Sequence, residues 1–570
     1  MRKYLAKQKP ETILILLLFV LNLLLVASSL LPSYDEINPF DGAKYIESGR
    51  QLVDGGELRE ISRSPTLALI YAVIYLFVRG SLNWFVLSAG IGNILLYSFL
   101  WLATFYFGLR FKDDFSPFVL IGILFISPAL IIILGNPSDA MFAALSAFAL
   151  AKTIDFYRSK RIPDVVWASI FVGLAFVTRL DGIYLFPLFI ILATVMGLHK
   201  IKLYRLIPAI ILPGLIVISV FHLVSGFTRG NFSSNIGGIA YASLMWYGTT
   251  DASGTLIGGE QVIETFGTGE ETSGSALVAF SRNPSAVLNQ IIGNLKKVPD
   301  QILSDYGGKK FTPYFLLFVF AGIYSLFRKK AYGLLILFTL WPLNVGLYLP
   351  YYTRSGYYLH SLFIPIILCA LGLAYIFSSE RNRKERFTIF LVLGTLLIYS
   401  LLDRKPAFVS VAVISLGVIS IYWLSQSMNS VPSRSEIVGL FIALAAGLIL
   451  RSPFSFPQPW DVGETPGEKV VQFLQTRLDR GDVVGSYVPK PVVAARMTEA
   501  RLYGVDIKND PVEDLRAWIH ANNVKAFVVV PNFINSYPEI WHAIELSQGT
   551  LVKLELVADP GSNQVFVVKE

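Results

Sequence analysis

The sequence predicts a polytopic α-helical membrane protein of about 13 transmembrane helices with a small C-terminal α/β soluble domain. Hydrophobic residues make up 54% of the 570 residues and charged residues only 15%, and the mean hydropathy is +0.57. That composition is far too apolar for a soluble globular protein. Apolar runs of about 20 residues, the length that crosses a bilayer, recur until about residue 450 and then stop.

Clusters of basic residues between the apolar runs predict the topology. The net charge of +8 lies in these clusters, as the positive-inside rule expects, so we expect no nucleic-acid partner. With the clusters and residues 1–9 in the cytoplasm, the N-terminus is inside and the C-terminal domain is extracytoplasmic. The clusters contain Arg110 and Lys112; Arg158, Lys160 and Arg161; Lys200, Lys202 and Arg205; Arg328, Lys329 and Lys330; and Arg381, Arg383, Lys384 and Arg386.

The apolar runs give the expected spans in chain order. The first, 12–31, is longer than the core of a signal peptide and is expected to be a retained helix. The run 65–78 has only about 14 residues. If it crossed the membrane, the next basic clusters would lie on the outer side, so we expect a helix lying in the outer interface. The other expected spans are 82–109, 116–134, 138–155, 164–179, 182–198, 206–226, 312–328, 331–350, 357–378, 387–402, 406–425 and 435–451.

The chain after residue 455 changes character. Thr465-Pro-Gly-Glu468 and Asp510-Pro-Val-Glu513 each read as an N-cap, a proline at the first helical position and a capping glutamate, which predicts helices over 466–479 and 511–522. Short runs rich in β-branched residues predict strands near Val483 and over 526–530, 551–557 and 565–568. We therefore expect a membrane domain over 1–455, with outer loops 32–81 and 228–311, and an α/β domain over 456–570.

The cysteine and histidines exclude some site classes. The single cysteine, Cys369, can form no internal disulfide. The five histidines show no ligand spacing, so a metal site of the His/Cys type is not expected. A requirement for a divalent metal held by carboxylates stays open.

Acidic residues gather in the first outer loop. Asp35, Glu36 and Asp41 precede Tyr45, and Arg63 follows. A carboxylate at this surface can act as a general base on an acceptor hydroxyl. The alternative is a solvated loop at the lipid headgroups.

Two later outer turns carry further candidates. Asp139 follows Ser138 at the start of a helix, where it could be catalytic or could simply complement the helix dipole. Arg179, beside Asp181, could bind phosphate oxygens bidentately, pair with that aspartate or extend to the headgroups.

Arg354 lies in a tyrosine-rich turn that ends at Tyr358. It could bind the phosphate or contact the lipid headgroups. His360 follows inside an apolar run, where an imidazole is costly unless it has a partner. It should therefore face the bundle interior or a water-filled cavity.

Taken in order, these short motifs resemble the GT-C glycosyltransferase superfamily, in the branch related to protein O-mannosyltransferases and the lipid A aminoarabinose transferase. The resemblance covers about residues 12–380. It rests on Asp41-Gly-Ala-Lys-Tyr45, Arg63-Ser-Pro65, Ser138-Asp139, Thr178-Arg-Leu-Asp-Gly182 and the segment from Arg354 to Tyr358.

The resemblance implies a sugar donor carried on a polyprenyl phosphate in the outer leaflet and an acid of the first outer loop as base. Asp41 matches that acid because Tyr45 follows four residues later, and Asp139 matches a second outer carboxylate. Arg179 and Arg354 would face the donor phosphate, with Arg63 a weaker candidate. Gly42 replaces a glutamate found in many relatives, and the pair Asp35-Glu36 precedes it, so the identity of the base stays open.

The expected function is a glycosyltransferase, hexosyl or pentosyl, that moves a sugar from a polyprenyl-phosphate carrier to a lipid, glycan or protein acceptor on the outer face of a prokaryotic plasma membrane. The resemblance implies inversion at the anomeric carbon. A transporter or lipid flippase is the alternative, and it would place polar residues at mid-helix along a translocation path. A non-catalytic scaffold for the C-terminal domain is a third possibility.

Overall fold

The computed structural model divides the chain into two compact units. Unit 1 comprises Met1–Val26, Leu95–Leu134 and Ser138–Ser455, and unit 2 comprises Ala27–Ile94, Gly135–Pro137 and Phe456–Glu570. The structure describes residues 10–32, 37, 41–55, 65–81, 83–115, 117–127, 129–179, 182–197, 201–226, 249–250, 256–257, 264–267, 271–272, 276–350, 357–377, 466–508, 510–530, 533–534, 537–547, 553–558 and 564–569.

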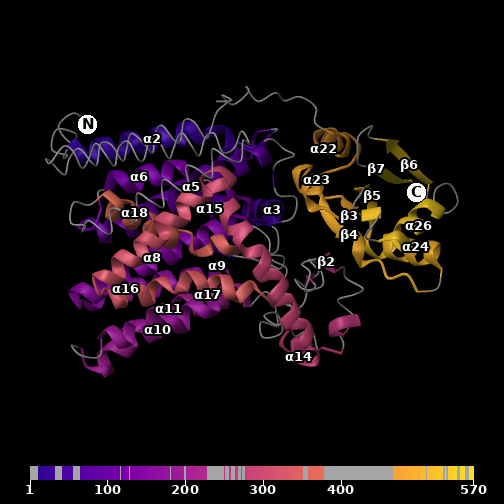
Figure 1. The fold of residues 1–570 in the computed structure, drawn as a ribbon. Coiled ribbons are helices and arrows are strands. Elements are labelled where there is room, and N and C mark those ends of the chain that lie inside the picture. The colour runs from indigo at the N-terminus through magenta and orange to yellow at the C-terminus, as the bar shows by residue number, and fades with distance from the viewer. Residues whose placement is uncertain are drawn as a thin grey trace, which may run out of the picture. The chain divides into compact units, whose positions relative to one another are not determined.

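Unit 1 consists mainly of apolar helices, several of which run side by side (Figure 1). Three of its α-helices, α2, α5 and α8, also contain residues of unit 2. The helices are α2 (Pro10–Leu30), α5 (Trp84–Gly108), α6 (Pro117–Ile126), α7 (Ala129–Ile132), α8 (Pro137–Ser159), α9 (Ile162–Thr178), α10 (Gly182–Gly197), α11 (Leu203–Gly226), α14 (Ala276–Arg282), α15 (Pro284–Arg328), α16 (Tyr332–Phe338), α17 (Leu340–Tyr348) and α18 (Phe363–Phe377), with 3-10 turns η3 (Leu109–Phe111), η4 (Ile133–Gly135) and η5 (Tyr357–Ser361) and two short strands, β1 (Thr249–Thr250) and β2 (Leu256–Ile257).

Three helices within the described residues are long and apolar enough to cross a membrane, namely Trp84–Phe111, Pro137–Ser159 and Leu203–Phe221. Every expected span from 12–31 to 357–378 overlaps a helix. The spans 387–402, 406–425 and 435–451 lie outside the described residues, so the total number of spans stays a prediction.

Helix α15 differs from its expected span. It contains 45 residues and begins at Pro284, so residues 284–311, expected to belong to an outer loop, are helical. The side chain of Asn283 accepts a hydrogen bond from the Ala286 amide at 3.1 Å, and Pro284 occupies the first turn. This is an N-terminal capping signal in the sequence. The sequence interpretation missed it because the segment is too polar to be a span.

Glycines allow close helix crossings in unit 1. A Cβ atom added at Gly322 of α15 would overlap the Leu368 carbonyl oxygen of α18, and one added at Gly372 would overlap the Phe318 carbonyl oxygen. Small residues let backbones approach in this way where helices pack within a membrane. Helix α11, by contrast, exposes large apolar side chains; Ile216, for example, is 60% exposed.

Unit 2 contains an α/β domain with a five-stranded sheet in the order β4-β3-β5-β7-β6. Strand β3 is parallel to β4 and β5, and β7 is antiparallel to β5 and β6. The strands are β3 (Val483–Ser486), β4 (Thr498–Arg501), β5 (Val524–Val529), β6 (Lys553–Ala558) and β7 (Gln564–Lys569), and the helices are α3 (Asp41–Asp54), α4 (Pro65–Val78), α22 (Pro466–Arg477), α23 (Pro489–Ala494), α24 (Pro511–Asn522) and α26 (Pro538–Ser547).

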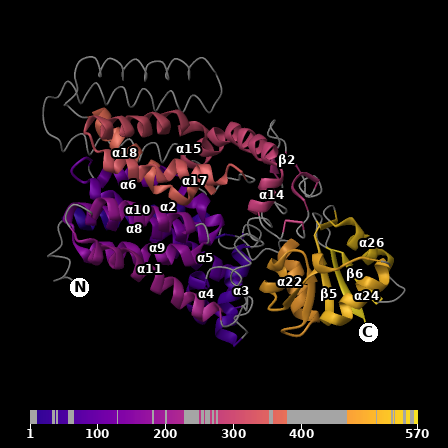
Figure 2. The same ribbon diagram turned by 90° about the horizontal axis from the view of Figure 1, so that it is seen from below.

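Alternating strand residues separate the two faces of this sheet. Ala526 and Val528 pack with α22 and α23, whereas Phe527 and Val529 pack with α24 and α26. In Figure 2, α22 lies on one side of β5, and α24 and α26 lie on the other. Helix α24 begins as its sequence predicts, because Asp510 Oδ1 accepts hydrogen bonds from the Val512 and Glu513 amides. Strand β4, Thr-Glu-Ala-Arg, was not predicted because it lacks an apolar pattern.

The N-terminal part of unit 2 is an α-helical pair. Helix α4 has the bounds expected for the interfacial helix, and several apolar side chains on it are exposed, Phe77 most of all at 83%. Helix α3 lies against α4 through Gly49, where an added Cβ would come within 2.5 Å of the Tyr71 backbone. The first outer loop expected from the sequence therefore contains a 14-residue amphipathic helix that begins at Asp41.

Candidate active site

A buried charged cluster forms around Asp139 in unit 1. Its Oδ1 atom forms an ion pair with Arg179 NH1 and lies 3.1 Å from His360 Nε2. The same Arg179 nitrogen donates a hydrogen bond to Ser138 Oγ at 3.2 Å. The structure thus brings together three of the residues predicted from the sequence, Asp139, Arg179 and His360, from three separate elements.

Local structure places each of the three side chains. Asp139 lies in the first turn of α8, where the helix dipole favours an acid. Helix α9 ends at Thr178, and Arg179 follows in an extended conformation while its amide still donates to the Ala175 carbonyl. His360 lies in the 3-10 turn η5, directly before α18.

The cluster is largely shielded from solvent. The exposed fractions of the side chains are 4% for Asp139, 0% for His360 and 18% for Arg179. The His360 ring packs edge-on against Phe142, with the ring centroids 5.4 Å apart, and Tyr358 is fully buried nearby in sequence. A buried charge is tolerated when it is paired and hydrogen-bonded, and Asp139 meets that condition.

The Asp139 carboxylate thus contacts both the Arg179 guanidinium and the His360 imidazole. Arg179 is the most exposed member of the cluster, and its planar fork can bind phosphate oxygens. The carboxylate holds that fork in one orientation.

The candidates of the first outer loop belong to unit 2. Asp41 is the first residue of α3, and Tyr45, one turn later, is 5% exposed. Five other predicted site residues lie outside the described residues, so their roles stay predictions. They are Asp35, Glu36, Arg63, Asp181 and Arg354.

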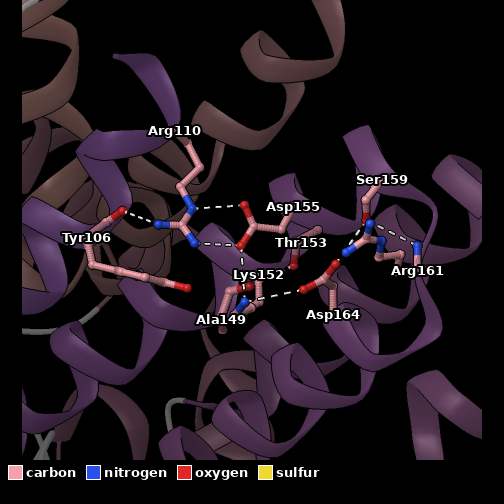
Figure 3. Close-up of polar contacts among 9 residues, drawn as sticks. All are labelled: Tyr106, Arg110, Ala149, Lys152, Thr153, Asp155, Ser159, Arg161 and Asp164. Carbon is pink, nitrogen blue, oxygen red and sulfur yellow. Dashed lines mark hydrogen bonds and ion pairs between the residues drawn. The ribbon is translucent and has the colours of Figure 1, made fainter.

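A second charged cluster joins α8 to α9 and to the end of α5 (Figure 3). The Arg110 guanidinium donates two hydrogen bonds to Asp155, at 3.0 and 2.5 Å, and one to the Tyr106 carbonyl at 2.6 Å. Lys152 Nζ lies 3.2 Å from Asp155 and 3.3 Å from Asp164. Two cations thus face two carboxylates, so this cluster holds helices together and needs no ligand for charge balance.

The sequence interpretation had treated Arg110 only as a topology signal. Lys152 and Asp155 are three residues apart on one helix, a spacing that predicts contact. The partnership of Arg110 with Asp155 arises from tertiary structure alone. As for metals, the described part of the chain holds no group of three or more His, Cys, Asp or Glu side chains placed to bind an ion.

The fold resembles that of a membrane transferase. The structure of ArnT from Cupriavidus metallidurans in the apo state matches with a TM-score of 0.57 and 12% sequence identity over 98% of both chains. The same enzyme bound to undecaprenyl phosphate matches with a TM-score of 0.50 and 14% identity, over 97% of this chain and 98% of that one. The Archaeoglobus fulgidus oligosaccharyltransferase tethered with an acceptor peptide gives a TM-score of 0.49 and 12% identity, over 97% and 74%.

No protein-family model matches the chain, and no curated protein sequence matches it. ArnT is the lipid A aminoarabinose transferase, a GT-C fold member. The fold expected from the sequence motifs is therefore confirmed. At 12–14% identity the likeness establishes the fold, and the chemistry must be argued from the residues of this chain.

Proposed function

We propose that the protein is an integral membrane glycosyltransferase that moves a sugar from a polyprenyl-phosphate carrier to an acceptor on the outer face of a prokaryotic plasma membrane. The observation that carries this proposal is the shared fold, which extends over 98% of both this chain and ArnT. The Asp139–Arg179 pair supports it, since an oriented guanidinium can bind two oxygens of a lipid phosphate.

The proposed reaction is a single displacement with inversion. Asp41 takes the proton of the acceptor hydroxyl as its oxygen bonds to the anomeric carbon, and the bond from that carbon to the phosphate oxygen breaks. The leaving group is the polyprenyl phosphate, whose negative charge Arg179 and Arg354 stabilise. Asp139 and His360 act through Arg179 by fixing its position.

Membrane lipids fit the same proposal. The exposed apolar side chains of α11 face a hydrocarbon environment, which a polyprenyl chain shares. For a transporter or flippase, the polar groups would be expected along the middle of the helices. In α8 the stretch between Asp139, in the first turn, and Lys152, in the second half, carries no charged residue.

The substitution Asp41→Asn tests the assignment of the base. We expect the rate of sugar transfer to fall by about 10²–10⁴-fold, because a positioned base contributes that much. The measurement is transfer of labelled sugar from a polyprenyl-phosphate donor by the full-length protein in liposomes. Asp113→Asn is the matched control, since Asp113 is an exposed acid between helices. Full activity of Asp41→Asn would move the role of base to Asp35, Glu36 or Asp139.

A further inference from the structure

Within unit 2, helix α23 connects the α/β domain to the α3–α4 pair. It packs directly against α3. In its first turn, Lys490 Nζ donates a hydrogen bond to the Ile37 carbonyl at 3.3 Å. Ile37 is 5% exposed and shortly precedes Asp41, the first residue of α3. The α/β domain therefore contacts the chain where it enters the helix that begins with the proposed base.

A second contact involves Arg496, in the turn that joins α23 to β4. Its guanidinium donates a hydrogen bond to the Arg79 carbonyl at 2.8 Å, directly after α4. Carbonyl groups at the end of a helix lack partners within the helix, and the helix dipole favours a cation there. The Arg496 guanidinium carbon also lies 5.4 Å from the centre of the Trp84 ring, at the start of α5. Arg496 thus joins the α/β domain to the end of one helix and the start of the next.

The contacts of Arg496 continue to α3. The Trp84 ring is 1% exposed and packs edge-on against Tyr75 of α4, with the ring centroids 5.3 Å apart. The Tyr75 hydroxyl donates a hydrogen bond to Asp54, the last residue of α3, at 3.1 Å. Through these side chains the α/β domain is connected to the C-terminal end of α3, and through Lys490 it is connected to the segment before the N-terminal end.

The backbone at Arg496 is left-handed, with φ at 64°. The Arg496 amide donates to the Val493 carbonyl at 2.9 Å, and the Met497 amide donates to the Val492 carbonyl at 3.0 Å. This pair of hydrogen bonds is the Schellman ending of a helix, in which glycine usually occupies the left-handed position. An arginine therefore stands where the backbone suits glycine, and its contacts with α4 and α5 give the side chain a role at this position.

We propose that Arg496 and Lys490 are positioning residues for sugar transfer, because they let the α/β domain fix α3 and with it the catalytic base. The assignment rests on the proposed function, in which Asp41 is that base. A base must lie within hydrogen-bond reach of the acceptor hydroxyl, so a small displacement of α3 lowers the rate of transfer. On this proposal the α/β domain contributes to catalysis by holding the first outer loop in place.

The substitution Arg496→Gly separates this role from the stability of the domain. It removes the guanidinium at a backbone conformation that glycine adopts freely. Asn523→Gly is the matched control, because Asn523 ends α24 in the same left-handed conformation and is exposed. Lys490→Met removes the other contact, and Lys469→Met, at an exposed lysine of α22, is its control. Thermal unfolding of the full-length protein in detergent should give both glycine variants nearly the wild-type midpoint.

Hydrogen exchange of α3 tests the contact without any substrate. We expect the backbone amides of residues 41–54 to exchange about 10-fold faster or more in Arg496→Gly and in Lys490→Met, because a helix that loses its tertiary contacts opens more often. Both control variants should exchange like the wild type. Unchanged exchange in one variant would remove that residue from the proposal, and unchanged exchange in both would overturn it.

Transfer kinetics then test whether the contact positions the base. We expect kcat to fall by about 10-fold or more in Arg496→Gly, while KM for the polyprenyl-phosphate donor stays near that of the wild type. In the Asp41→Asn background the same substitution should lower the rate no further, since it acts through that carboxylate. An unchanged kcat, or losses that multiply in the double variant, would overturn the positioning role.

The two kinds of measurement keep this inference separate from the proposed function. A folded wild type that transfers no sugar would refute the proposed function. Faster exchange of α3 in Arg496→Gly and Lys490→Met would still establish that the α/β domain fixes this helix, because that measurement needs neither donor nor acceptor.

Discussion

The Nε2 atom of His360 lies 3.1 Å from the Oδ1 atom of Asp139, the same oxygen that forms the ion pair with Arg179. The aspartate thus connects the start of α8 with η5 and with the end of α9. Because the three side chains are largely buried, removing the charge of one partner leaves the charge of the other unpaired in a buried site. This relationship sets the first prediction.

Asp139→Asn is expected to lower the free energy of unfolding by about 3 kcal/mol, because it leaves the Arg179 charge beside an uncharged amide in a mostly buried site. The measurement is thermal or denaturant unfolding of the purified protein in detergent. Loss of a helix cap alone would cost about 1 kcal/mol. A change no larger than that would mean that the ion pair contributes little to stability.

Arg110 and Asp155 should be coupled in a double-mutant cycle. We expect Arg110→Met and Asp155→Asn to show an interaction energy of about 2 kcal/mol, the size of a charged hydrogen-bonded contact. Sugar transfer per folded molecule should remain near that of the wild type, since this cluster is structural. A loss of turnover without a loss of stability would contradict that role.

Gly372→Ala is expected to prevent normal packing of α18 on α15. The added Cβ overlaps the Phe318 carbonyl oxygen, and a backbone atom within a helix cannot move aside. The variant should accumulate poorly and unfold at a lower temperature. Gly346→Ala is the matched control, because nothing lies within 4 Å of the added Cβ in α17 and alanine favours the helix. Equal behaviour of the two variants would refute the close crossing.

Cysteine labelling should place Arg161 inside and Lys508 outside. The native Cys369 is buried, and replacing it with serine leaves a background for single exposed cysteines. Lys508 is 69% exposed and therefore serves as a reporter for the C-terminal domain. In intact cells an impermeant reagent should label Lys508→Cys and spare Arg161→Cys. The reverse pattern would invert the topology.

Elements that local chemistry specifies could be predicted from the sequence. Apolar runs of sufficient length produced helices α8, α9 and α11 close to their expected bounds, because a continuous apolar segment has one stable conformation in hydrocarbon. The Asp510 cap and Pro511 fixed the start of α24 for an equally local reason. Short motifs in a fixed order pointed to the fold that the comparison with ArnT confirms.

The contacts between polar side chains depend on how the helices pack. Nothing local in the chain connects Arg110 with Asp155, or Asp139 with His360, since these pairs form between helices that are distant in sequence. The packing of α23 against α3 likewise arises only in the tertiary structure. Local propensity specifies where a helix begins and ends, whereas the partner of a charged side chain is set by how the helices and strands pack.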